Sequence, residues 1–265
     1  MNVVYSPFEI LYLAIVIDSL SYSLGAILYG SPIPVRAVKD MGYKMILNSL
    51  YVAVLSNIFG FIISLVNQLQ TVLGVSWNVF YLDIGLLQVQ MVTALNMAKI
   101  IYVVIATILY YSRISTILSS FITPILQYIS FLTDLLILLN FYMNLGAFIQ
   151  TSYMLLIAIG VLLMSLPFQM GKGIGSLLIA FTIVFYIGFP LLPILISSTS
   201  PLQSQNLIFQ DIALQTEEFF GDIPALSYSF IIVPLTYIGV LAGFSIVLES
   251  FIGGYAGKLP IPIEI

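Results

Sequence analysis

The chain has 265 residues, of which 61% are hydrophobic and 7% are charged, and its formal net charge is −4. Soluble domains carry about 25% charged residues, so this sequence has too few charged side chains to cover a surface that faces water. The composition predicts an all-α, polytopic membrane helix bundle in the cell membrane, with residues 1–265 forming a single integral membrane domain.

Cysteine and histidine are both absent from the chain. This excludes disulfides, metal or haem sites that depend on Cys or His, and Cys nucleophiles. We therefore expect no catalytic, cofactor or metal site, and no enzymatic activity. The negative net charge also does not suggest tight nucleic-acid binding, which normally uses a basic surface.

Apolar segments of about 20 residues predict transmembrane helices, and the sequence contains about seven of them. They are approximately Glu9–Tyr29, Met45–Val66, Gly85–Tyr111, Ile117–Leu139, Ala147–Leu166, Ser176–Ile196 and Ala225–Phe251. A short turn near Phe141–Gly146 is expected to separate the fourth span from the fifth. The longest polar stretch, Ser197–Pro224, contains acidic residues and no Lys or Arg, which predicts an acidic extracytoplasmic loop at about 197–224.

Basic residues test this arrangement, because cytoplasmic loops of membrane proteins are enriched in Lys and Arg. With seven spans, six of the seven basic residues fall on one side of the membrane. They are Arg36, Lys39, Lys44, Arg113, Lys172 and Lys258. The pattern predicts that this side is cytoplasmic, with the N-terminus outside and the C-terminus inside.

The segment Leu166–Ile196 combines a glycine-rich turn with a proline-containing apolar run. A phosphate-binding loop requires the pattern GxxxxGK[ST], whereas here a glycine follows Lys172, so nucleotide binding is not expected. The turn instead predicts a cytoplasmic hinge, followed by a helix that bends at its prolines. The predicted hinge residues are Gly171, Gly173, Gly175, Pro190 and Pro193.

Polar residues recur at helical spacing inside two of the predicted spans. One stripe contains Ser49, Ser56, Gly60 and Asn67, and the other contains Thr123, Gln127, Ser130 and Asp134. Lipid cannot satisfy such groups, so both stripes are expected to face protein or a water-filled cavity. They either line a path or hold helices together, and the sequence leaves both interpretations open.

Lys99 lies within the third predicted span. An ionised lysine in the membrane costs at least about 2.5–3.5 kcal/mol, so it needs a partner or an aqueous neighbourhood. Asp134 and Asp18 lie at similar predicted depth and are the candidate partners. Such an ion pair would either gate, couple protons or contact a polyanion, or it would fix the register of the helices.

The segment Pro167–Pro193 also carries a family resemblance. After the proline and the basic, glycine-rich turn come Ile-Gly-Ser-Leu-Leu-Ile-Ala and an apolar run to Phe-Pro-Leu-Leu-Pro. In these residues, and in size and multi-span layout, the chain resembles the CedA family of polytopic membrane components of the crenarchaeal DNA-import (Ced) system. That family is related to TrbL-type subunits of conjugation and type IV secretion machines.

The resemblance implies a channel or scaffold subunit that passes DNA, as cargo, across the lipid bilayer of the cell membrane. It implies a cytoplasmic hexameric ATPase of the conjugation type as the energy source, together with small membrane companion subunits. Whether the chain forms homo- or hetero-oligomers is left open. The docking or DNA-facing residues implied on the cytoplasmic side are Arg36, Lys39, Lys44, Arg113 and Lys172.

An alternative function is a secondary transporter or channel for a small solute or ion, using Lys99 with Asp18 or Asp134. The two hypotheses predict different structures. A transporter is expected to have a closed pocket at the membrane midplane. An assembly subunit is expected to expose an apolar groove that needs partners.

Overall fold

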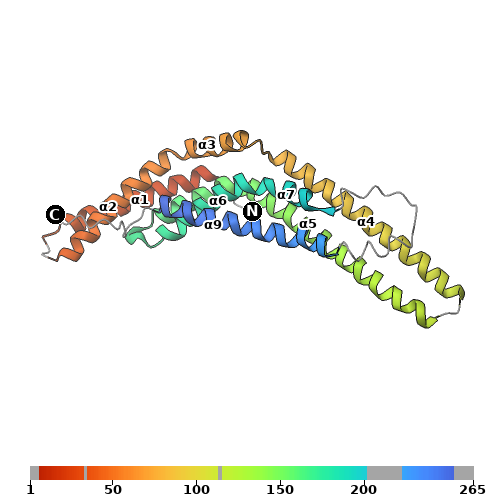
Figure 1. The fold of residues 1–265 in the computed structure, drawn as a ribbon. Helices are drawn as coiled ribbons and strands as arrows, with labels where there is room; N and C mark the ends of the chain where they lie inside the picture. The colour runs from red at the N-terminus through yellow and green to blue at the C-terminus, as the bar shows by residue number, and fades with distance from the viewer. Residues whose placement is uncertain (1–5, 33–34, 113–114, 202–222, 254–265) are drawn as a thin grey trace, which may run out of the picture. The chain divides into compact units, whose positions relative to one another are not determined.

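The structure is a computed structural model that describes residues 6–32, 35–112, 115–201 and 223–253, and these residues contain helices and no strand (Figure 1). The predicted all-α class is therefore confirmed. The long helices are α1 Pro7–Gly30, α2 Arg36–Asn57, α3 Phe59–Val72, α4 Trp77–Ser112, α5 Ser115–Met164, α6 Lys172–Gly188, α7 Leu192–Thr199 and α9 Val233–Ile252. Shorter elements are the 3₁₀ turns η1 Pro167–Gln169 and η2 Phe189–Leu191 and the π-helical turn η4 Tyr228–Ile232.

Five helical segments of the described residues are long and apolar enough to cross a membrane. They are Pro7–Gly30, Trp77–Ile108, Ile122–Met164, Lys172–Thr199 and Ile223–Ile252. A sixth arises if α2 and α3, which meet at a bend of 56°, are taken as one span. Many large apolar side chains lie on the outside, including Phe8 (72% exposed) and Leu235 (68%). An exterior this apolar belongs in a lipid bilayer.

The structure has fewer separate spans than the seven that the sequence predicts, because the turn expected near Phe141–Gly146 is helical. These residues lie inside α5, which runs unbroken for 50 residues. Just before this segment, the side chain of Asn140 donates to the carbonyl of Leu136 within the same helix, at 2.9 Å. At 1.5 Å per residue α5 is about 75 Å long, more than twice the hydrocarbon thickness of a bilayer.

The chain divides into two compact units. Unit 1 contains Met1–Gly74, Phe148–Phe189 and Val240–Ile265, and unit 2 contains Val75–Ala147 and Pro190–Gly239. The divisions at Ala147 and Gly239 fall inside α5 and α9. The single membrane domain expected from the sequence stays a prediction.

Close contacts between glycines hold two helix pairs of unit 1 together. A Cβ on Gly42 of α2 would lie 2.7 Å from the carbonyl oxygen of Gly25 of α1. Likewise, a Cβ on Gly175 of α6 would lie 2.5 Å from the carbonyl oxygen of Gly160 of α5. Small residues let membrane helices approach backbone to backbone and gain packing energy there. These two crossings therefore fix α1 on α2 and α5 on α6.

Unit 2 combines an apolar core with hydrogen bonds between helices. On α4, the fully buried Phe80, Ile84, Leu87 and Met91 recur every three or four residues and form one face of the helix. Farther along the chain, the hydroxyl of Ser229 donates to the carbonyl of Thr199, at 2.6 Å. This bond ties the start of the last helical segment to the end of α7.

Alanine substitutions in the first turn of α6 should distinguish the effect of close helix packing on stability from the effect of helix propensity. Gly175→Ala should lower the free energy of unfolding by about 1–3 kcal/mol, because the new methyl group would overlap Gly160 and Met164. Gly173→Ala is the matched control, since a Cβ there would meet no atom within 4 Å. Thermal unfolding of the purified protein in detergent measures both. Equal effects of the two substitutions would contradict the packing argument.

Candidate functional site: an apolar groove and a basic end of unit 1

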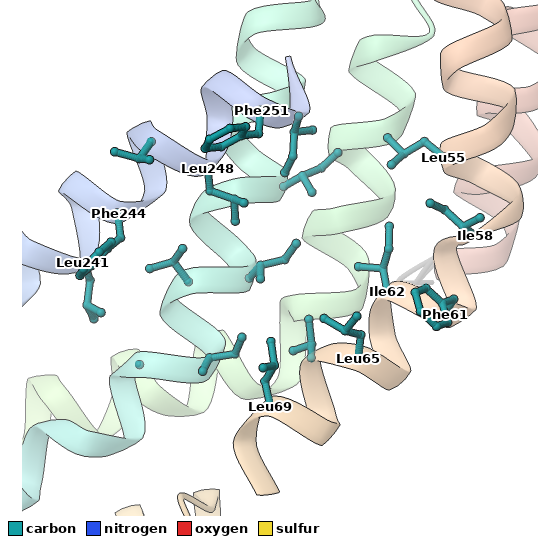
Figure 2. Close-up of a pocket in the computed structure, with 18 residues that line it drawn as sticks. Leu55, Ile58, Phe61, Ile62, Leu65, Leu69, Leu241, Phe244, Leu248 and Phe251 are labelled. Atoms are coloured by element: carbon teal, nitrogen blue, oxygen red, sulfur yellow. The ribbon is translucent and has the colours of Figure 1, made fainter. Parts of the chain in front are cut away.

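Unit 1 contains an apolar groove of about 680 Å³ between α3, α6 and α9 (Figure 2). Its walls come from the end of α2 and from α3, from the second half of α6, and from the last part of α9. The lining residues are Leu55, Ile58, Phe61, Ile62, Leu65, Val66, Leu69, Ile179, Ile183, Val184, Ile187, Gly188, Leu241, Phe244, Val247, Leu248, Phe251 and Ile252. None of them has a polar side chain.

The bend between α2 and α3 gives the groove its first wall. The side chain of Asn57 donates to the carbonyl of Ala53, at 2.7 Å. Side chains that bond back to the preceding turn often bend a helix, and here the helix breaks at Ile58, with φ −89° and ψ 5°. Beyond the break, Phe61, Leu65 and Leu69 recur every four residues and therefore share the face that lines the groove.

Hydrogen bonds between helices hold the walls in place. The side-chain amide of Gln70, at the end of α3, donates to the carbonyl of Tyr186 of α6, at 2.7 Å. The hydroxyl of Tyr51 of α2 donates to the carbonyl of Ile252 at the end of α9, at 2.7 Å. Ser176 of α6 donates to a carboxylate oxygen of Glu249 of α9, at 3.0 Å. Each pair of walls is thus linked outside the groove, and its interior stays free of polar groups.

The chemistry of the groove restricts what can bind there. Phosphates and sugars need hydrogen-bond donors or positive charge, and the lining offers neither. Phe61 (66% exposed), Phe244 (61%) and Phe251 (75%) leave much apolar surface uncovered. The groove therefore suits an apolar partner and excludes contact with DNA.

The basic residues of unit 1 gather at one end of it. Gln169 of η1 donates to the carbonyl of Lys44 of α2, at 3.3 Å. A pocket of about 530 Å³ lies at this contact and includes Asp40, Lys44 and Phe168 in its lining. Lys172 begins α6 directly after this turn. Arg36 and Lys39 lie in the first turn of α2, before Lys44.

The spacing of the apolar segments predicts one side of the membrane for these four residues, and unit 1 brings them to one end. The end of α9 also lies beside the first turns of α6, through Ser176 and Glu249. Lys258 follows α9 and lies outside the described residues, as does Arg113. Which side of the membrane this end faces stays a prediction.

The turn before α6 is made by residues other than its glycines. Phe168 and Gln169 have φ of 60° and 59°, a left-handed conformation that is uncommon for side chains of this size. Gly171 instead allows close packing, because a Cβ there would collide with the carbonyl oxygen of Leu163. Gly175 packs on Gly160, and Gly173 faces open space.

The predicted bend in the following helix coincides with an interruption between α6 and α7. Pro190 lies in η2, and Pro193 lies in the first turn of α7. A hinge motion at these prolines or at the glycines of the preceding turn stays a prediction.

The two predicted polar stripes have different environments. In the first stripe, Ser49 is 2% exposed, and its hydroxyl donates to the carbonyl of Asp18 of α1, at 3.3 Å. Asn67 accepts from the hydroxyl of Tyr186 of α6, at 3.4 Å. In contrast, the second stripe, Thr123, Gln127, Ser130 and Asp134, is exposed along its whole length on α5. Ser49 and Asn67 of the first stripe therefore bond to neighbouring helices, whereas the second stripe remains available for contacts outside the described part of the chain.

The predicted ionic site is not assembled in the parts of the chain that are described. Lys99 of α4 and Asp134 of α5 both belong to unit 2, both are exposed, and no ion pair joins them there. Asp18 belongs to unit 1 and is 6% exposed. Pairing of Lys99 with either aspartate stays a prediction.

Sequence reasoning missed two groups of polar residues. Gln88 of α4 donates to Asn140 of α5, at 3.2 Å, and Asn140 had not been identified as an interhelical contact. Ser21 and Asn48 donate to backbone carbonyls at the end of α5. Carbonyl acceptors leave no signal in the sequence, because every residue has one.

Comparison with known proteins gives two matches. A family model described as DNA import protein CedA1 matches residues 1–72. A curated protein named DNA import protein CedA, from Sulfolobus acidocaldarius, is 30% identical over 265 residues, which cover 98% of this chain and 99% of that protein. The chain belongs to the CedA family. No solved structure matches it.

Membership of the CedA family confirms the resemblance found in Pro167–Pro193, and the match extends far beyond that segment. The family model ends at residue 72, where α3 also ends. The matched part therefore contains α1, α2 and α3, including the first wall of the groove and three of the basic residues.

The absence of native cysteine makes single-cysteine labelling a direct test of the basic end. Lys39→Cys and Met170→Cys should be labelled from the same side by a membrane-impermeant maleimide, because both positions are exposed at that end. The expected orientation predicts labelling only after the cells are permeabilised. Leu73→Cys, just after α3, is the control and should be labelled in intact cells. Labelling of Lys39→Cys and Met170→Cys from opposite sides would contradict the arrangement.

Proposed function

We propose that the chain is a membrane subunit of a DNA-import apparatus and serves as a scaffold or channel component through which DNA crosses the cell membrane. The observation that carries this proposal is the 30% identity to DNA import protein CedA over nearly the whole of both chains. Similarity over that extent argues for a shared role of the entire protein rather than of one segment. The multi-pass arrangement, the relation to TrbL-type subunits and the absence of enzymatic activity belong to the same proposal.

The apolar groove supports an assembly role. A transporter for a small solute needs polar groups around an enclosed site, whereas the groove of unit 1 is open and lined only by apolar side chains. Its wall on α3 extends from Phe61 to Leu69, about two turns of helix. We place an apolar helix of a small membrane companion subunit in this groove.

The exposed polar stripe of α5 supports a role beside an aqueous path. Thr123, Gln127, Ser130 and Asp134 lie within a segment apolar enough to span a membrane, yet their side chains are exposed. Lipid would leave these groups unsatisfied. In the assembled apparatus the stripe faces water or another subunit. The negative charge of Asp134 repels phosphates, so DNA would pass this surface without binding tightly.

The basic end of unit 1 is the surface that we assign to the energy-supplying partner. Arg36, Lys39, Lys44 and Lys172 converge there beside the exposed Phe168. A positively charged patch attracts a partner with an acidic surface and speeds their association, and an exposed aromatic side chain such as Phe168 is typical of protein interfaces. A cytoplasmic hexameric ATPase of the conjugation type would dock at this end and supply the energy for import.

Deletion of the gene tests the proposal as a whole. Cell-to-cell DNA transfer should be lost while the gene for the ATPase is retained, because DNA would have no path across the membrane. Expression of the wild-type chain in the deletion strain should restore transfer. Normal transfer in the deletion strain would overturn the proposed function.

Complementation with groove variants tests the assembly role separately. Leu65→Gln should reduce DNA transfer by about tenfold or more, because burying an amide against an apolar helix costs on the order of 1–3 kcal/mol. Val72→Gln, at a position that is 82% exposed and outside the groove lining, is the matched control. Immunoblots of membrane fractions establish equal amounts of protein. Equal DNA transfer by the two variants would contradict a role of the groove in assembly. The role of the chain in DNA import would still be decided by the deletion strain.

A further inference from the structure

A buried polar cluster lies where α1, α2 and the end of α5 meet in unit 1. Asp18 and Ser21 come from α1, Asn48 and Ser49 come from α2, and Ser165 follows α5; all five are buried. Asp18 is 6% exposed and lies midway along α1, about 18 Å from either end of the helix. An acidic side chain at this depth in a span-length helix marks a functional site by default.

The donors of this cluster are already engaged. The hydroxyl of Ser21 donates to the carbonyl of Ser165, at 2.9 Å, and the amide of Asn48 donates to the carbonyl of Met164, at 3.0 Å. The hydroxyl of Ser49 donates to the backbone carbonyl of Asp18, at 3.3 Å. The bonds of Ser21 and Asn48 do not reach the carboxyl group of Asp18, whereas the hydroxyl of Ser49 also interacts with that carboxyl group.

Two buried oxygen atoms of this cluster have no hydrogen-bond partner among the described residues. They are Oδ1 of Asp18 and Oδ1 of Asn48. They come from facing helices at the same level, because Ser49, which adjoins Asn48, bonds to Asp18. Both atoms are acceptors when the carboxyl group is ionised, and a protonated carboxyl group supplies one donor. Protonation of Asp18 would therefore add one donor to a cluster that contains two unpartnered acceptors.

We propose that Asp18, together with Asn48, forms a buried binding site for one proton in the membrane. A metal cation fits less well, because hard cations take about six oxygen ligands and two unpartnered oxygens are present. Proton uptake converts the carboxylate into a neutral donor and removes the large cost of burying a charge. The site goes beyond the proposed import function and does not depend on it.

The surroundings of Asp18 contain few other groups that titrate. Tyr22 of α1 lies one turn away, and Tyr51 of α2 donates its hydroxyl to Ile252. Lys44 lies one turn before Asn48 on α2 with an exposed side chain, and Lys39 and Asp40 lie nearer the start of that helix, also exposed. The turn η1, which packs on both helices, contains no titratable side chain. Asp18 is therefore the group whose proton the cluster would hold.

Difference infrared spectroscopy tests the site directly on the full-length protein in lipid nanodiscs. Between high and low pH, the wild type should gain a carboxylic-acid C=O band that is absent from Asp18→Asn, the nearly isosteric neutral variant. Asp134→Asn is the matched control, since it removes an exposed acid of unit 2 and should keep the band. Asn48→Leu should keep the band and shift its frequency, because the acceptor of the new hydrogen bond is removed. A pH-dependent spectrum that is the same in the wild type and Asp18→Asn would overturn the proposal.

Thermal unfolding gives an independent measurement. Proton binding by the folded state should make the wild type more stable at low pH, with its Tm falling by about 3 °C per pH unit as the proton is lost. Asp18→Asn should lose this part of the pH dependence, and Asp134→Asn should keep it. A Tm that follows Na⁺ concentration at constant pH and ionic strength, and loses that response in Asp18→Asn, would overturn the assignment to a proton and identify a metal cation site.

Discussion

The packing of unit 1 depends on close backbone contact between helices, because an apolar exterior removes the usual reason for helices to associate. In lipid, the side chains outside a bundle are as well solvated by hydrocarbon as those inside it. The crossings of Gly25 with Gly42 and of Gly160 with Gly175 supply the van der Waals contact that replaces the hydrophobic effect. A few side chains that donate to backbone carbonyls, such as Gln70 and Tyr51, then fix the remaining helices.

This way of packing explains why an apolar groove and a buried polar cluster can coexist in one unit. Polar groups are used where helices must be held in register, and they are satisfied mostly by carbonyls of neighbouring helices. The groove lies between those ties, where α3 diverges from α2 after the bend at Ile58. Exposing the apolar lining of the groove to lipid carries no free-energy penalty. The groove can therefore stay open in a bilayer, whereas a soluble protein would have to bury these side chains.

The sequence predicted the features that depend on composition along the chain. The grouping of Arg36, Lys39, Lys44 and Lys172 followed from their positions between apolar runs, and unit 1 brings them to one end. The helical class and the family resemblance followed in the same way. These features are insensitive to the exact contacts between helices.

Features that depend on contacts between helices were missed. A turn was predicted near Phe141–Gly146, but α5 continues through this segment, and the amide of the neighbouring Asn140 bonds to Leu136 while its oxygen accepts from Gln88. No proline lies at the break at Ile58, so the sequence gives no signal for it. The glycines around Lys172 suggested a flexible turn, whereas Gly171 and Gly175 serve close packing and the turn itself uses Phe168 and Gln169. The sequence alone does not decide these cases. Asn and Gly are typical of turns that face water, but where two helices pack together Asn can form a hydrogen bond and Gly can allow close contact.

The position of Asp18 connects the buried cluster with the basic end. Ser21 bonds to the carbonyl of Ser165 and Asn48 bonds to the carbonyl of Met164, the last residue of α5, and both carbonyls lie just before the turn that contains Phe168 and Gln169. Gln169 in turn bonds to Lys44. The buried cluster and the basic end are therefore both joined to the segment that links α5 to α6. Because that turn holds two residues in an uncommon backbone conformation, it persists only where the surrounding structure supports it, and the hydrogen bonds to Met164, Ser165 and Lys44 supply contacts on both sides of it.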